Sequence, residues 1–168
     1  MSAGPLLLAL DFGGTKLAAA LAVAGEGCHD DLRARGWLAR VEAASPPGRT
    51  AASDMRIMRE LAERLLAEQR RPPAAIGVSF GGPVAAGRRL VLLSHHVPGW
   101  EQICLCDRLE AELGAPAFMD NDANAAALGE HRFGAGQGYH SLLYITVSTG
   151  IGGGWILNGQ VWGGADGM

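Results

Sequence analysis

The sequence predicts an α/β domain with a mixed sheet, on three observations. Short apolar runs alternate with segments of helical periodicity along the chain. Two of the apolar runs end at a glycine pair, in LLLALDFGG at residues 6–14 and in AAIGVSFGG at residues 74–82. Glycine supplies 25 of the 168 residues. That share is about twice the usual ~7%, so tight turns or close backbone approach to a ligand are expected.

The predicted elements follow from periodicity and from turn residues. Ile57, Leu61 and Leu65 recur every four residues, which is typical of an amphipathic helix, and Pro72 stops that helix. In chain order the first half predicts a strand at residues 6–11, its hairpin partner at 17–23, polar turns over 25–49, a helix over 53–71, and a strand at 74–80. The second half predicts a glycine turn at 81–84, a strand at 115–122, a helix over 123–133, and a strand, a glycine loop, a further apolar run and an Asn-Gly turn over 141–168.

Composition and charge exclude several classes of protein. The chain is 48% hydrophobic and 18% charged, as in a globular domain rather than a disordered one. Its formal net charge is −3, and arginines alternate with acids over residues 55–71, so a basic face for nucleic acid is not expected. The amino terminus has no basic flank, and its apolar run is too short for a signal peptide or a membrane span. These features predict a cytoplasmic protein with no membrane partner.

The three cysteines are too few for a disulfide framework and favour a reducing compartment. Cys104 and Cys106 invite a metal-site interpretation, with His95 and His96 as further ligands. A closed zinc site usually has two ligand pairs at set spacings, and these cysteines lie in a predicted amphipathic helix. We therefore expect Cys104 and Cys106 to be buried thiols.

The turn after the first strand has the chemistry of a phosphate site. Gly13 and Gly14 allow backbone N–H groups to converge on an anion, and Asp11 beside them can hold a hydrated metal ion that travels with phosphate. A protein-kinase Asp-Phe-Gly motif would need far more than the ten preceding residues, and the P-loop spacing is absent. A plain hairpin turn, in which the glycines serve only geometry, stays open on this motif alone.

A second polar segment, MDNDANAAALGE, begins at Met119. Asp122 is expected at the start of a helix, where the helix dipole favours the ionised carboxylate, so it could act as a general base. Asn121 beside it can orient a polyol through hydrogen bonds. The alternative is that Asp120 or Asp122 only caps the helix. The later run STGIGGG at residues 148–154 lacks the dinucleotide-binding spacing and suits a second phosphate-holding hairpin better.

Five ordered motifs resemble those of the ROK family (repressor, open reading frame, kinase): LDFGGTK, GVSFGGPV, VPGW, DNDANAAALGE and TVSTGIGGGWILNG. The resemblance implies the actin/hexokinase-like ATPase fold, which is ribonuclease H-like, with a first domain over residues 1–138 and the opening hairpin of a second over residues 139–168. It also implies an ATP-dependent, glucokinase-like kinase that transfers the γ-phosphate of Mg-ATP to a hexose hydroxyl, and a homo-oligomer.

The same resemblance implies roles for individual residues. Asp122 would be the base, and Asp11 would hold Mg²⁺ through water. The residues expected to bind the sugar are Asn121, Asp122, Gly82 and His96. The residues expected to bind the ATP phosphates are Asp11, Gly13, Gly14, Thr15 and Lys16 in the first loop and Thr149, Gly150, Gly152 and Gly153 in the second.

Two departures from the family pattern qualify these expectations. His96 stands where the family commonly has Asn two residues before Pro-Gly-Trp, so one sugar contact differs. The sequence also stops before the family's zinc-binding segment and adenosine wall, which leaves open whether these 168 residues act alone. A non-catalytic sugar-binding module or a decayed fragment is the alternative. A repressor is disfavoured, because no helix-turn-helix segment fits before the first loop.

Overall fold

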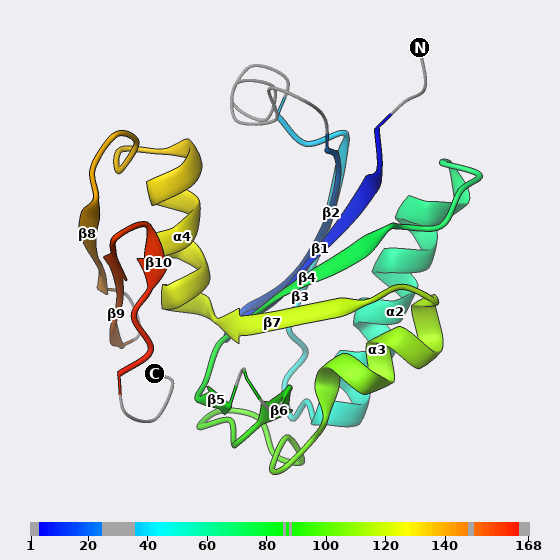
Figure 1. The fold of residues 1–168 in the computed structure, drawn as a ribbon. Helices are drawn as coiled ribbons and strands as arrows, with labels where there is room; N and C mark the ends of the chain where they lie inside the picture. Colours follow the sequence, from blue (N-terminus) through cyan, green and yellow to red (C-terminus); the bar gives the residue numbers. More distant parts are fainter. Residues whose placement is uncertain (1–3, 25–35, 86, 88, 148–149, 165–168) are drawn as a thin grey trace.

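The structure is a computed structural model that describes residues 4–24, 36–85, 87, 89–147 and 150–164. Its centre is a five-stranded sheet of order β3-β2-β1-β4-β7 (Figure 1). β1, β2 and β3 are antiparallel neighbours, whereas β4 runs parallel to both β1 and β7, which confirms the predicted mixed sheet. The strands are β1 (Leu6–Phe12), β2 (Lys16–Val23), β3 (Ala39–Ala44), β4 (Ala75–Phe80) and β7 (Ala117–Asn121).

Two helices, α2 (Ala51–Ala67) and α3 (Leu105–Leu113), cover one face of this sheet (Figure 1). Alternate side chains of β1 enter the core there, and Leu6, Leu8 and Leu10 are each at most 2% exposed. Full burial of one such side chain contributes about 1.5–3 kcal/mol. Because this face is filled, the sheet holds the ends of its strands rigidly.

The helix predicted over residues 53–71 is present with shifted ends. It begins earlier because Thr50 caps it: Thr50 Oγ1 accepts from Ser53 N, and Ser53 Oγ accepts from Thr50 N, in a reciprocal capping box. It ends at Ala67, and Arg70 has a left-handed backbone with φ of 53°, which cannot continue a helix.

Strand β3 corrects the prediction of turns over residues 25–49, within the part that the structure describes. Its side chains alternate between half-buried and exposed, so it lacks the apolar run that marked the other strands. Its pairing with the edge of β2 forms it instead, and a Lys16 Nζ to Glu42 Oε2 ion pair of 3.4 Å accompanies that pairing. A contact between distant segments overrides local preference here.

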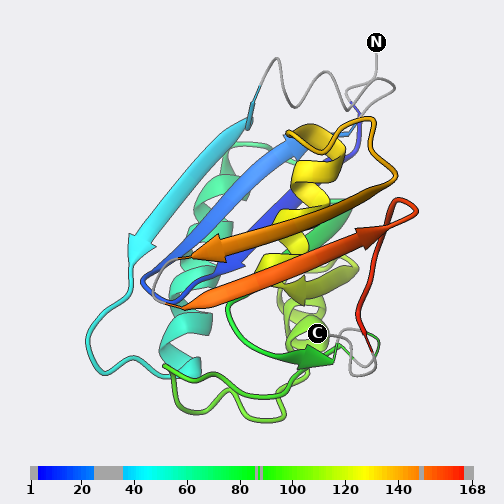
Figure 2. The ribbon, with the colours of Figure 1, turned by 90° about the vertical axis from the view of Figure 1, so that its left-hand side faces the viewer.

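Helix α4 (Asp122–Phe133) leaves the sheet at the end of β7, and a second sheet of order β10-β9-β8 packs on its other side (Figures 1 and 2). The predicted Asn-Gly turn is confirmed, because Asn158 and Gly159 both have positive φ, of 51° and 78°. The strands are β8 (Ser141–Val147), β9 (Ile151–Leu157) and β10 (Gln160–Val161). A small antiparallel pair, β5 (Val84–Ala85) and β6 (Leu90–Val91), follows the glycine turn after β4.

The prediction for the cysteines is correct in one case and wrong in another. Cys106 lies buried in α3, and burial raises the pKa of its thiol. Cys104 is exposed, because it is the N-cap residue of α3 and lies outside the helix's apolar stripe. Cys28 lies outside the described residues. In the described part of the chain, no helix is long and apolar enough to cross a membrane.

Candidate functional site

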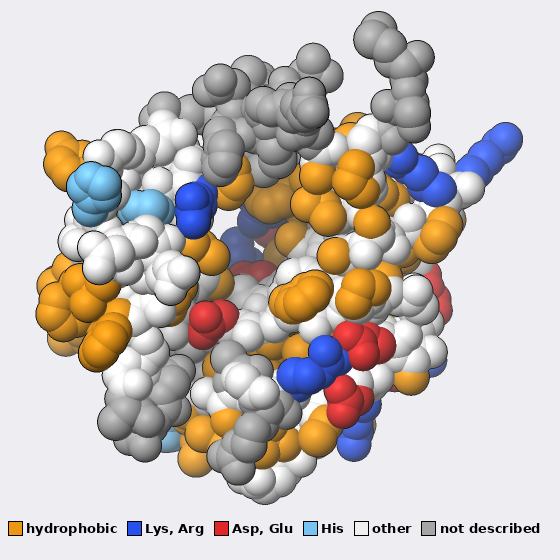
Figure 3. Space-filling model, in the orientation of Figure 1, with side chains coloured by type: hydrophobic (Ala, Val, Ile, Leu, Met, Phe, Trp, Pro, Cys, Tyr) orange, Lys and Arg blue, Asp and Glu red, His pale blue; other side chains and the backbone are white. Residues whose placement is uncertain are grey.

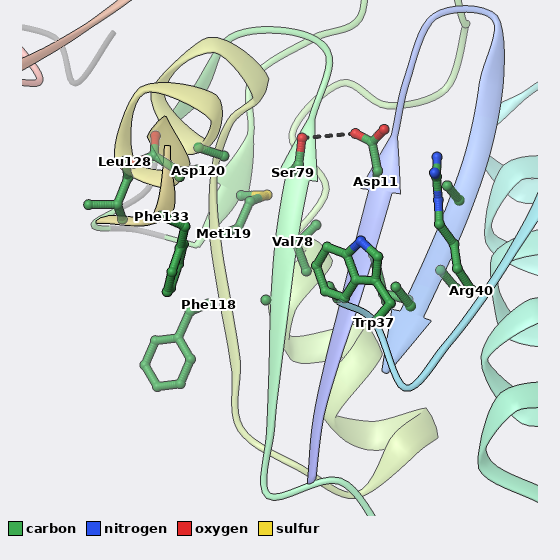
Figure 4. A pocket seen from close by; sticks show the side chains of 18 of the residues that line it. Asp11, Trp37, Arg40, Val78, Ser79, Phe118, Met119, Asp120, Leu128 and Phe133 are labelled. Atoms are coloured by element: carbon green, nitrogen blue, oxygen red, sulfur yellow. Dashed lines mark hydrogen bonds between the residues drawn. The ribbon is translucent and has the colours of Figure 1, made fainter. Parts of the chain in front are cut away.

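Three polar side chains form a row across the carboxyl ends of β1, β4 and β7. The strand registers pair Asp11 with Ser79 and Ser79 with Asp120. Ser79 Oγ donates a hydrogen bond of 2.9 Å to Asp11 Oδ1, as Figure 4 shows. The carboxyl ends of parallel strands are where open α/β sheets bind ligands.

This row lines a cavity of about 1030 Å³ between the sheet face that α2 and α3 leave open and α4. Figure 3 shows the hollow on the molecular surface, with acidic and basic side chains inside it. The rest of the wall is mostly apolar and includes the side chains of Trp37, Phe118 and Leu128 (Figure 4). Asp11 and Asp120 therefore face a large open space.

The first glycine turn directly follows Asp11. A Cβ on Gly13 would lie 2.9 Å from Lys16 O, so glycine is needed for the chain to close this turn. Gly14 is exposed, and no atom lies within 4 Å of the place its Cβ would take. Thr15 and Lys16 are also exposed, and Lys16 is held at β3 by Glu42. The turn thus presents open backbone at Gly14.

Helix α4 begins at Asp122, one residue before the predicted range of 123–133, and neither aspartate provides the side-chain cap. The N-cap is Asn121, whose Oδ1 accepts from Ala123 N at 3.0 Å and whose Nδ2 donates to Gly82 O at 3.0 Å. Asp122 Oδ1 also accepts from Ala123 N, at 2.9 Å. Asp120 Oδ1 instead accepts from the Asn121 N–H and from Asn124 Nδ2. Asn121 therefore fixes the start of α4 against the turn that follows β4.

Asp122, the first glycine turn and the turn after β4 meet at Gly81. The point where a Cβ on Gly81 would lie is 3.7 Å from Asp122 Oδ2, 3.7 Å from Gly13 Cα and 3.1 Å from Phe12 O. Gly81 N donates to Phe12 O at 2.9 Å, which ties the two turns together. The structure thus brings the predicted base beside the predicted first phosphate loop.

The later glycine run packs against Ala123, the residue that follows Asp122. A Cβ on Gly152 would be 3.5 Å from Ala123 Cβ, and one on Gly154 would be 2.5 Å from Ala123 O, so β9 packs closely against the first turn of α4. Gly150 is exposed at the start of this strand, and Gly153 pairs with Ile145 of β8. Thr149 lies outside the described residues.

His96 and Gly82 complete the predicted set. His96 lines a small cavity together with Gly13, Gly14 and Gly81. Gly82 presents its carbonyl oxygen to Asn121. The predicted sugar-binding residues therefore lie near the turns that follow β1 and β4.

Two residues at the site were not predicted from the sequence. Ser79 was predicted only as part of a buried strand. Both that strand and the first one end at a Phe-Gly-Gly sequence, so the position of Ser79 opposite Asp11 could have been inferred. Arg49 was included only in a turn, and no local signal marks it. Its guanidinium donates to Gly13 O at 3.0 Å. In the described part of the chain, no cluster of three or more His, Cys, Asp and Glu side chains could hold a metal ion. Asp11 could still bind the hydrated Mg²⁺ of a nucleotide, which needs only one or two carboxylates.

The mixed sheet, its strand-end carboxylates and its glycine turns define the class of protein: the fold is the actin/hexokinase-like ATPase fold, and its solved neighbours include ROK sugar kinases. A ROK hexokinase from Thermus thermophilus superposes with a TM-score of 0.77 at 38% identity, over 96% of this chain and 50% of that one. A ROK family glucokinase from Streptomyces griseus, solved with glucose and AMPPNP, superposes with a TM-score of 0.78 at 36% identity, over 97% of this chain and 48% of that one.

Sequence comparison agrees with the superpositions. The ROK family model matches residues 7–168, and the chain belongs to the ROK family. A glucokinase of Halalkalibacterium halodurans is 40% identical over 109 residues, which are 64% of this chain and 33% of that protein. An N-acetylmannosamine kinase of Salmonella typhimurium is 34% identical over 161 residues, 96% of this chain and 50% of that protein. The chain therefore spans between a third and a half of the length of these curated relatives.

Proposed function

We propose that this chain is part of an ATP-dependent kinase that phosphorylates a hydroxyl group of a hexose. The observation that carries the proposal is the meeting of Asp122 Oδ2 and the Gly13 turn at Gly81. A sugar kinase needs a proton acceptor next to a phosphate-binding backbone, because the attacking hydroxyl must lie in line with the transferred phosphoryl group. The glucokinases and the N-acetylmannosamine kinase among the relatives support a hexose as the acceptor.

In this proposal Asp122 accepts the proton of the attacking hydroxyl. Its place in the first turn of α4, beside the Gly13 turn, supports that role. A positioned general base contributes about 10²–10⁴ in rate. Asn121, Gly82 and His96 would contact the sugar. The amide nitrogen Nδ2 of Asn121 carries two hydrogens, and one of them is donated to Gly82 O, while Oδ1 caps α4. The second Nδ2 hydrogen is the group that would contact the sugar.

The phosphates of ATP would be held by backbone and side-chain groups of the two glycine turns. Gly13, Gly14, Thr15 and Lys16 would serve in the first turn, and the exposure of Gly14 supports its approach to a ligand. In the second turn the proposed residues are Thr149, Gly150, Gly152 and Gly153. Mg²⁺ would neutralise phosphate charge, with Asp11 binding its water, and Ser79 fixes the Asp11 carboxylate for this task.

Several further features belong to the same proposal. We propose a first ATPase-like domain over residues 1–138 and the start of a second at residues 139–168, a cytoplasmic location and a homo-oligomer. The outer face of β8 and β9 supports association, because Ile145, Val147 and Ile151 are at least 61% exposed on it. The alternative, a sugar-binding module without catalysis, would bind a hexose without consuming ATP.

A hexose panel with Mg-ATP tests the function directly. The protein as its gene encodes it is incubated with glucose, mannose, N-acetylmannosamine and other hexoses, and ADP release is followed by a coupled assay. The proposal predicts sugar-dependent ADP release with at least one hexose. Sugar binding by calorimetry without any ADP release would favour the binding module.

A further inference from the structure

Arg49 is a buried cation that contacts the first glycine turn from a distant part of the chain. It precedes α2, and its side chain is only 8% exposed. Its Nη2 donates a 3.0 Å hydrogen bond to the carbonyl oxygen of Gly13, 36 residues earlier. Its Nη1 donates to Ser45 Oγ. A buried guanidinium is costly unless its surroundings hold it, so these contacts have structural consequences.

Asp54 and Trp100 hold Arg49 from the other side. Asp54 Oδ1 lies 3.8 Å from Arg49 Nη1, and Trp100 Nε1 donates to Asp54 Oδ2 at 3.4 Å. Burial raises the pKa of the Asp54 carboxyl, while Arg49 and the Trp100 hydrogen bond oppose that rise. Trp100 is itself fixed, because its ring packs edge-on against Phe12 and Phe80 with centroids 5.4 and 5.0 Å away. Arg49 is thus anchored to the hydrophobic core.

The hydrogen bond to Gly13 O sets the direction of the next peptide group. A trans peptide is planar, and its C=O and N–H point in opposite directions. Because the Gly13 carbonyl points to Arg49, the N–H of Gly14 points away from Arg49. Gly14 is exposed, with no atom within 4 Å of its Cβ position. The contact therefore selects one orientation of a backbone donor in an exposed turn.

We propose that Arg49 is a positioning residue that holds the Gly13–Gly14 peptide in the orientation needed to bind a nucleotide phosphate. The proposal rests on the proposed kinase function for its ligand. It distinguishes Arg49 from an ordinary buried ion pair, whose loss would weaken the fold without affecting phosphate binding. Glycine turns have many accessible conformations, so an external anchor reduces the entropy lost when the ligand binds.

Four variants separate positioning from stability. Arg49→Met removes the contact and leaves Asp54 buried without its cation. Arg49→Met combined with Asp54→Asn removes both charges, and Asp54→Asn alone keeps the contact with Gly13. Arg56→Met, on the exposed face of α2, is the control, since that arginine pairs with the exposed Glu60.

We measure Tm, the KM for Mg-ATP and the Kd for the hexose in the protein as its gene encodes it. The double variant is expected to recover most of the Tm lost in Arg49→Met, but its KM for Mg-ATP should stay roughly 10-fold to 100-fold above wild type. Its hexose Kd should change less than about twofold. Arg49→Lys should have a KM for Mg-ATP closer to the wild-type value than that of Arg49→Met, because lysine can still donate to Gly13 O. A double variant with wild-type Tm and wild-type KM would overturn the proposal.

A readout that does not need activity keeps the two proposals separate. Backbone ¹⁵N relaxation gives order parameters for Gly13 and Gly14 in the absence of ligand. We expect them to fall in the double variant and to stay at the wild-type value in Asp54→Asn and Arg56→Met. If wild type phosphorylates no hexose, the kinase proposal fails, while unchanged order parameters in the double variant would refute the role of Arg49.

Discussion

Ser79 Oγ donates a 2.9 Å hydrogen bond to Asp11 Oδ1 across two adjacent parallel strands. The bond fixes one oxygen of the carboxylate at the rim of the large cavity and leaves the other available. A carboxylate that binds a metal ion through water gains from such an anchor, because outer partners orient the group and tune its affinity. Ser79 is therefore expected to support the function that we propose for Asp11.

Replacing Ser79 with alanine tests this expectation. Ser79→Ala should raise the Mg²⁺ concentration needed for half-maximal activity by about 10-fold, because loss of an outer-sphere partner typically weakens metal binding by that much. The hexose Kd should stay within about twofold of wild type, since Ser79 lies on the opposite sheet face from Asn121. A Mg²⁺ titration of the kinase rate at saturating ATP gives the answer, with the exposed Ser141→Ala as control. An unchanged Mg²⁺ requirement would contradict the role of Ser79.

At Gly81 the turn after β1, the turn after β4 and the proposed base Asp122 approach one another. A Cβ there would lie 3.1 Å from Phe12 O and 3.7 Å from Asp122 Oδ2, so Gly81→Ala must push the turns apart by a few tenths of an ångström. We expect kcat to fall about 10-fold or more, because small displacements of a base from its reactive geometry are costly. Gly77→Ala is the matched control, since no atom lies within 4 Å of its Cβ position. Equal rates for the two variants would show that the spacing at Gly81 is not needed.

The raised pKa of Asp54 predicts a pH dependence of stability. The native state holds the Asp54 proton to higher pH than the unfolded state, whose pKa is about 3.9. Between these two pKa values the native state binds more protons, so the free energy of unfolding falls as pH rises. Relative to Asp54→Asn, wild type should therefore lose Tm as pH increases from about 4. Calorimetric scans of both proteins from acid to neutral pH measure this; a wild type that gains Tm relative to the variant over that range would contradict the prediction.

The exposed outer face of the second sheet predicts self-association of this 168-residue chain. Ile145 is 61% exposed and Ile151 is 82% exposed on that face. The substitutions Ile145→Lys and Ile151→Lys together should shift the chain toward a monomer, because two charges on this face oppose apolar association. Light scattering at several concentrations compares the double variant with wild type. Identical masses at every concentration would mean that this face is not used.

The sequence was sufficient for those parts of the fold that depend on local pattern. The strand before Asp11, the helix that begins at Asp122 and the Asn-Gly turn at Asn158 all follow from residues close in sequence, and the structure contains them. β3 was missed because its pairing with β2, and not an apolar run, forms it. Ala39, Val41 and Ala43 do alternate with the charged Arg40 and Glu42, and this period-2 pattern is the local signal that could have found the strand.

The site residues that lie in local sequence patterns were predictable, whereas those that depend on contacts between distant segments were not. Strand-end carboxylates and glycine pairs mark Asp11, Asp122 and the turns beside them. The capping role of Asn121 and the reach of Arg49 to Gly13 O depend on where separate turns meet, which only the folded chain defines.

Asp122→Asn tests the central claim most directly. Asparagine keeps the size of the side chain and an acceptor oxygen at the start of α4, but it cannot take up a proton from a hydroxyl group at neutral pH. We measure kcat with the preferred hexose and Mg-ATP, and the hexose Kd by calorimetry, for wild type and variant. We expect kcat to fall by about 10²–10⁴, while the hexose Kd stays within about threefold of wild type. A variant that keeps near-normal kcat would contradict Asp122 as the base.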